Sequence, residues 1–118
     1  MFSINGNVIS LTRGDSAYIT LRINGGGENA YKLESGDIVS CQVRPGVNTD
    51  ELLFDGTPQL EWKVGGTDIL WHIRPQDTND ADPNTEYYWD AQLTLSNGDV
   101  FTFIPASRFK ILDEVTLL

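Results

Sequence analysis

The chain has 118 residues, of which 40% are hydrophobic and 21% charged, and its formal net charge at pH 7 is −9. This composition is typical of a globular domain and excludes global disorder. The negative charge repels phosphate backbones, so we expect no nucleic-acid partner. The N-terminal stretch MFSINGNVIS has no basic segment and no long apolar run, which predicts synthesis in the cytosol without a signal peptide or transmembrane helix.

Apolar and polar residues alternate through most of the chain, as in β-strands with one buried face. A short hairpin is predicted around Asn5-Gly6, and a strand over Ala17 to Ile23, which the glycines of NGGGEN then end. Turns are predicted at Gly65-Gly66 and Asn97-Gly98. The remaining strands are predicted where apolar residues alternate: Val39, Cys41 and Val43; Leu60, Trp62 and Val64; Ile69, Trp71 and Ile73; Tyr87, Trp89, Ala91, Leu93 and Leu95; the segment DVFTFI; and Arg108 to Leu112.

About eight short strands separated by turn signals predict a single all-β domain over residues 1–118, an immunoglobulin-like antiparallel β-sandwich. Tyr87 begins a strand after a long acidic loop, two residues before Trp89, which is the placement of a tyrosine-corner residue. The alternative for Tyr87 is an ordinary core tyrosine. The three tryptophans lie on the apolar sides of their strands, so core packing is favoured over a ligand platform.

The dipeptide Gly-Asp occurs three times, beginning at Gly14, Gly36 and Gly98, and each pair directly precedes a β-rich run. Glycine accepts the positive φ needed at the end of a turn, and the aspartate then accepts hydrogen bonds from nearby backbone N–H groups. We therefore interpret Arg13-Gly14-Asp15 as a turn that leads into a strand, with Arg13 incidental to it. Cell adhesion through this tripeptide is the disfavoured alternative.

Residues for catalysis are sparse. His72 is the only histidine, is predicted to face outward beside Arg74, and has no serine or cysteine that spacing matches to it. Cys41 is the only cysteine, so no internal disulfide forms, and its apolar neighbours predict a buried thiol. We expect no catalytic residues, no cofactor and no enzymatic activity, and a small enzyme is the alternative that these absences disfavour.

Oxygen donors for a hard cation gather in the loop QDTNDADPN: Asp77, Asp80, Asp82 and Asn84. Calcium prefers such ligands, but an EF-hand loop starting at Asp80 fails, because Thr85 replaces its glycine and Ala91 its bidentate glutamate. We therefore expect a solvated acidic loop closed by Pro83, and no metal site.

Six short motifs follow one another in the order of a known family: LTRGDSA from Leu11, YKLESGDIV from Tyr31, IRPQDT from Ile73, YWDAQL from Tyr88, NGD from Asn97 and EVT from Glu114. Together they resemble the N-terminal domain of the baseplate upper proteins, among the tail and baseplate proteins of phages and prophages of Gram-positive bacteria. The resemblance spans nearly the whole chain. It implies a β-sandwich that docks onto the tail or baseplate, helps to hold receptor-binding components, and has no catalytic residues.

The leading hypothesis is therefore a non-enzymatic phage tail or baseplate structural protein, made in the bacterial cytoplasm and assembled into the virion tail. Its partners are expected to be other tail or baseplate proteins and not a membrane, with self-association inside the tail as a further option. The alternative is a carbohydrate-binding accessory domain for the host cell wall, which predicts an exposed tryptophan.

The expected mechanism is edge-strand pairing together with a modest apolar patch. Candidate contact residues are the apolar residues at the two ends of the chain: Met1, Phe2, Val115, Leu117 and Leu118. The alternative is that Phe2 and Val115 pair into the sheet.

Overall fold

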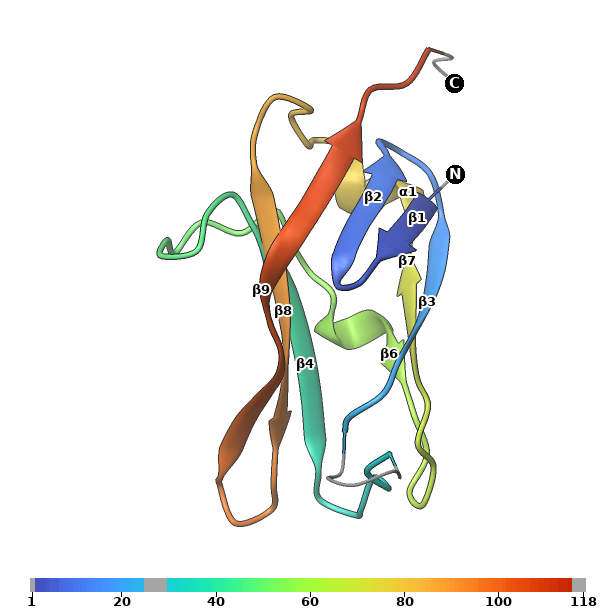
Figure 1. Ribbon diagram of the computed structural model, residues 1–118, viewed down its shortest axis with the longest axis vertical. Coiled ribbons are helices and arrows are strands. Elements are labelled where there is room, and N and C mark those ends of the chain that lie inside the picture. The colour runs from blue at the N-terminus through green and yellow to red at the C-terminus, as the bar shows by residue number, and fades with distance from the viewer. Residues whose placement is uncertain (1, 25–29, 116–118) are drawn as a thin grey trace.

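The structure, a computed structural model, describes residues 2–24 and 30–115, with residues 2–5 given by their backbone alone. Nine strands in the described residues form two sheets (Figure 1). The larger sheet has the order β1-β2-β9-β8-β4-β5, comprising β1 (Phe2–Asn5), β2 (Val8–Thr12), β9 (Val100–Leu112), β8 (Tyr87–Thr94), β4 (Ile38–Arg44) and β5 (Phe54–Asp55). The smaller sheet has the order β3-β7-β6, comprising β3 (Ala17–Leu21), β7 (Ile69–Ile73) and β6 (Leu60–Glu61).

This arrangement is an immunoglobulin-like sandwich, as the strand pattern predicts. Strands β3, β7 and β6 take the places of immunoglobulin strands B, E and D, and β4, β5, β8 and β9 those of C, C′, F and G. One pairing departs from the predicted antiparallel sheets, because β2 runs parallel to β9, with Ile9 opposite Phe109. A parallel pair needs a long crossover between its strands, and here almost the whole domain separates the two in sequence.

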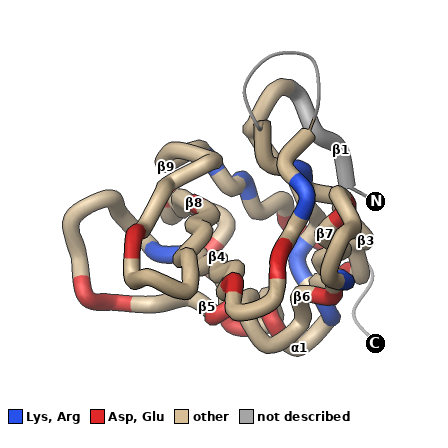
Figure 2. The backbone as a smooth tube through the Cα atoms, turned by 90° about the horizontal axis from the view of Figure 1, so that it is seen from below, with Lys and Arg blue, Asp and Glu red and all other residues tan. Residues whose placement is uncertain are grey.

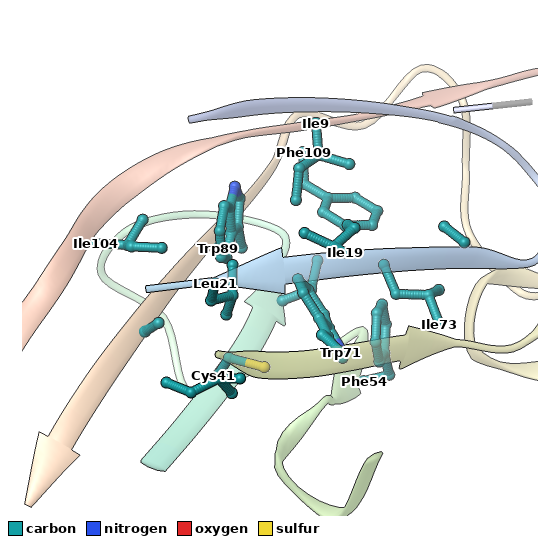
Figure 3. Close-up of a cluster of buried hydrophobic side chains, with 14 of the residues drawn as sticks. Ile9, Ile19, Leu21, Cys41, Phe54, Trp71, Ile73, Trp89, Ile104 and Phe109 are labelled. Atoms are coloured by element: carbon teal, nitrogen blue, oxygen red, sulfur yellow. The ribbon is translucent and has the colours of Figure 1, made fainter. Parts of the chain in front are cut away.

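The core lies between the two sheets and is built from the inward residues of the strands. Trp71 and Phe109 are fully buried, and the ring centroids of Trp71 and Trp89 lie 5.4 Å apart (Figure 3). Trp71 belongs to β7 and Trp89 to β8, so this contact joins the two sheets. The predicted burial of Cys41 is confirmed, and this burial raises the pKa of its thiol, which keeps it in the unreactive protonated form.

Gly56 occupies a point in this core that has no space for a side chain. It follows β5 and leads into the 3-10 helix η1 (Thr57–Gln59), and its N–H donates to Cys41 O at 3.0 Å. A methyl group on Gly56 would lie 2.6 Å from Cys41 Sγ and 2.7 Å from Trp71 Nε1. The absence of a side chain therefore lets the chain pass between β4 and β7.

Three local features differ from the expected strands. The segments DVFTFI and Arg108 to Leu112 are parts of one long strand, β9, which accommodates Pro105 in a bulge because Trp89 faces Ser107 while Ala91 faces Ile104. β6 ends at Glu61 instead of Val64, since Gly65 N donates to Leu33 O (2.6 Å) and draws this segment away from β7. The short elements β5, η1 and α1 (Pro75–Thr78) lie where the residue pattern predicts loops.

Candidate functional site

The glycines of the three Gly-Asp turns have the predicted positive φ, whereas the predicted hydrogen bond from a backbone N–H to the aspartate is seen at Asp37, and Asp99 accepts instead from Asn97 Nδ2 (3.2 Å). The φ angles of these glycines are 82° (Gly14), 91° (Gly36) and 94° (Gly98). At the second turn Asp37 Oδ2 accepts hydrogen bonds from Glu34 N (2.8 Å) and from the hydroxyl of Tyr31 (2.7 Å), which raises the pKa of Tyr31 to about 12. Gly14 N donates to the buried Thr78 Oγ1 at 2.9 Å, so the first turn is also fixed to α1.

The interpretation of Arg13 as incidental is wrong. Its guanidinium donates from Nε and Nη2 to both carboxylate oxygens of Glu114 (2.8 and 3.0 Å), and also to Asp113 (3.0 Å) and to Ala81 O (3.1 Å). This pairing lowers the pKa of the Glu114 carboxyl. Arg13 therefore ties the segment after β9 and the loop before β8 to the β2–β3 turn, and its charge is engaged within the chain.

Tyr87 forms the tyrosine corner, which settles the alternative left by the sequence. Its ring is buried at the start of β8, and its hydroxyl accepts a hydrogen bond from Asp82 N at 2.9 Å. The acidic loop is thereby fixed to the sandwich from within.

Two carboxylates of the acidic loop QDTNDADPN accept hydrogen bonds from groups within or next to the loop. Asp82 accepts from Asn84 N (2.9 Å) and from Thr85 Oγ1 (3.1 Å), while Asp77 accepts from Arg74 N (2.8 Å) and caps α1. No group of three or more histidine, cysteine or acidic residues in the described ranges converges on a point where a metal ion could bind. Figure 2 shows the acidic residues spread around the backbone instead of gathered at one place.

The predicted contact residues at the chain ends are only partly described. Met1, Leu117 and Leu118 lie outside the described residues. Phe2 belongs to β1 and pairs with Leu11, whereas Val115 lies beyond β9 and is fully exposed. Since Leu11 pairs in turn with Ile111, Phe2 and the last residues of β9 lie at the same end of the larger sheet.

The tryptophans do not form an exposed platform. Trp71 and Trp89 are buried, as core packing predicts, and Trp62 is half-buried. The indole N–H of Trp89 donates to Asn7 O at 2.8 Å, which closes the sheet against the β1–β2 turn.

The outer surface of the smaller sheet carries two cross-strand pairs of side chains, which we call the aromatic face: the exposed Tyr18 with the half-buried His72, and the exposed Thr20 with the exposed Leu70. Tyr18 is 71% exposed and stacks flat on His72, with ring centroids 4.3 Å apart and planes 5° from parallel. Leu70, which is 51% exposed, pairs across the strands with Thr20. His72 therefore faces outward as predicted, but it stacks on Tyr18.

A hollow of about 480 Å³ adjoins the aromatic face at Leu70. Its lining includes the half-buried Trp62 and the turn residues Gly66 and Thr67. At its rim the exposed Arg22 Nε donates to Asp68 Oδ1 at 2.6 Å, which lowers the pKa of that carboxyl. An apolar side chain of a binding partner could enter this hollow beside Leu70.

The outer surface of the larger sheet has a different character. A groove of about 550 Å³, which we call the polar groove, crosses β4 and β8. Its floor consists of three cross-strand pairs of half-buried residues: Ser40 with Gln92, Gln42 with Asp90, and Arg44 with Tyr88. The loop of residues 46–50 between β4 and β5 forms its wall and projects outward past β8 and β9 in Figure 1.

Arg44 holds this wall in place. Its Nη1 donates to the carbonyl oxygens of Thr49 (3.4 Å), Asp50 (3.0 Å) and Glu51 (3.0 Å), and its Nη2 donates to Gln42 Oε1 (2.6 Å). Partial burial in the groove raises the pKa of Asp90, against the opposing effect of the Arg44 charge.

Both surfaces were missed by reasoning from the sequence. The even positions of the strand from Ala17 predict a wetter face, so Tyr18 carries no separate signal. Gln42 and Asp90 are likewise ordinary outward residues until the strand register places them opposite each other. The available signal is the run of polar residues at outward positions, Ser40, Gln42 and Arg44 on one strand and Asp90, Gln92 and Thr94 on the other, and alternation alone cannot say that the two strands are neighbours.

These features define the chain as an immunoglobulin-like β-sandwich that carries an aromatic face on one sheet and a polar groove on the other. No family model matches the chain, and no curated protein matches it. In the described residues there is no helix with both the length and the apolar character to cross a bilayer.

Proposed function

We propose that this protein is a non-enzymatic structural subunit of a phage tail or baseplate and that it assembles with another tail protein through its aromatic face. The observation that carries the proposal is the flat stack of the exposed Tyr18 on His72, beside the exposed Leu70. The motif order that resembles baseplate upper proteins supports the choice of a tail protein as the partner.

The aromatic face has properties suited to protein–protein contact. Aromatic side chains are enriched at the centres of interfaces, where they supply large contact areas. Stacking on His72 already orders the Tyr18 ring, which reduces the entropy lost on binding. The hollow beside Leu70 offers a place for one anchoring side chain of the partner.

The position of β3 adds a second contact of the expected kind. Among the described residues β3 is the end strand of the smaller sheet, so a strand of the partner can pair with its outer edge. Tyr18 and Thr20 point outward from this same strand. Main-chain pairing and burial of the aromatic face can therefore occur in one interface.

The proposal is tested with tail particles from the strain that encodes the protein. We expect the wild-type chain to co-sediment with purified tails, and the double variant Tyr18→Ser/Leu70→Ser to be lost from them while its melting temperature is unchanged. Ile38→Ser is the matched control, because Ile38 is exposed to 59% on β4 of the other sheet. Absence of the wild-type chain from tails, or normal incorporation of the double variant, would contradict the proposal.

A further inference from the structure

We propose that the polar groove is a binding site for a neutral saccharide. The site is separate from the aromatic face and from the tryptophans, and it does not depend on the function proposed above. Its volume of about 550 Å³ lies within the range of small-molecule sites.

The floor of the groove presents hydrogen-bonding groups that are not used by the protein. Within residues 2–24 and 30–115, the side chains of Asp90, Gln92 and Ser40 form no hydrogen bond to another residue. Gln42 accepts from Arg44 through Oε1, which leaves its amide hydrogens free to donate. Three kinds of group thus meet in the groove: a carboxylate acceptor, amide groups and a hydroxyl.

This set matches the hydroxyl groups of a sugar ring. A hydroxyl donates one hydrogen bond and accepts others, so neighbouring hydroxyls can donate to Asp90 while they accept from Gln42 or Gln92. The cross-strand pairing of Gln42 with Asp90 places a donor beside an acceptor. Asp90 is half-buried, which strengthens hydrogen bonds to its carboxylate because there is less competing water.

Other ligand classes fit the groove less well. Asp90 and Asp50 line it, and Arg44, the one cationic side chain among the described lining residues, is already bonded to the loop. The neighbouring Arg108 lies over the Tyr88 ring and pairs with Glu86, so phosphates and acidic sugars are disfavoured. The floor has no apolar pocket for the side chains by which extended peptides are recognised. Because Arg44 holds the loop of residues 46–50 in place, little conformational entropy is lost in ordering this loop when a ligand binds.

The test is an NMR titration of the full chain with oligomers of glucose, galactose, mannose, rhamnose and N-acetylglucosamine, and with trigalacturonate as an anionic comparison. We expect at least one neutral oligomer to shift the side-chain amide signals of Gln42 and Gln92, and trigalacturonate to bind more weakly. Asp90→Asn keeps the shape of the floor but removes the charge, and Gln92→Ala removes an amide; each is expected to raise the Kd about tenfold.

Thr94→Ala is the matched control, because Thr94 points outward from β8 outside the groove, and its Kd should equal that of the wild type. The proposal is overturned if no neutral oligomer shifts Gln42 and Gln92, or if trigalacturonate binds as tightly as the neutral oligomers. It is also overturned if both groove variants, shown by their spectra to be folded, bind like the wild type.

Discussion

The aromatic face and the polar groove lie on opposite sheets of one sandwich and differ in almost every property that governs recognition. The aromatic face offers the exposed Tyr18 ring stacked on His72, together with Leu70, beside the strand β3 that ends the smaller sheet among the described residues. The groove offers half-buried polar groups beneath a loop held by Arg44. Both arise from the same alternation of residues along strands, so the chemistry of each surface can vary while the interior stays the same.

The largest effect is expected from a substitution in the core, because both surfaces depend on the same packed interior. Phe109 is fully buried and contacts Phe54 edge to face, with centroids 6.0 Å apart. Phe109→Ala is expected to lower the free energy of unfolding by about 3–5 kcal/mol, because it leaves a cavity. Urea denaturation followed by tryptophan fluorescence measures the change.

The control for this variant is Phe101→Ala on the same strand, where the ring is 52% exposed. Its expected loss is below about 0.5 kcal/mol. Equal losses at the two positions would mean that β9 does not bury Phe109 as described.

A smaller change tests the contact in the core between β4, whose outer side forms the polar groove, and β7, whose outer side forms the aromatic face. A methyl group at Gly56 would meet Cys41 on β4, the strand of the groove, and Trp71 on β7, the strand of the aromatic face. Gly56→Ala is expected to cost about 1–3 kcal/mol, because neither neighbour can move away freely. Amide chemical shifts should change on both sheets at once.

Gly46→Ala is the corresponding control, because a methyl group there meets only Thr49 Cγ2 at 3.5 Å, an ordinary contact. Its melting temperature should match the wild type. A Gly56→Ala protein as stable as the wild type, with shifts confined to one sheet, would show that the two surfaces do not meet at this residue.

The smallest expected effect lies at the end of the sandwich, away from both surfaces. Arg13 lowers the pKa of Glu114 in the folded chain, so this pair stabilises the fold above the usual glutamate pKa and stops doing so as pH falls through the lowered value. Arg13→Ala should therefore melt below the wild type at neutral pH, by less than Gly56→Ala, and the difference should shrink in acid. Calorimetry across pH, with Arg13→Lys as the charge-preserving comparison, measures this. A difference that stays constant with pH would contradict the role of the ion pair.

Alternation and turn chemistry were sufficient to predict the fold. Buried and more exposed residues alternate along β3, β4, β7 and β8 as the apolar and polar residues do in the sequence. The positive φ of Gly14, Gly36 and Gly98 agrees with the Gly-Asp dipeptide that precedes each β-rich run. The parallel β2–β9 pair and the bulge at Pro105 depend on contacts between distant segments, which local patterns do not encode.

The surfaces were harder to predict for a related reason. An outward tyrosine or glutamine looks the same in sequence whether it stands alone or beside a partner, and only register unites Tyr18 with His72 or Gln42 with Asp90. The role of Arg13 was missed because Glu114 lies at the far end of the chain. The side-chain contacts of the predicted residues Met1, Leu117 and Leu118 lie outside the described structure.

The contact between Trp71 and Trp89 has a consequence for where such a domain can work. Trp89 stands two residues after the tyrosine-corner residue, the position at which antibody domains place a cysteine of their inter-sheet disulfide. Packed rings join the sheets here, and this contact contains no disulfide that a thiol could reduce. The stability of this sandwich should therefore be the same in a reducing cell interior as in an oxidising exterior.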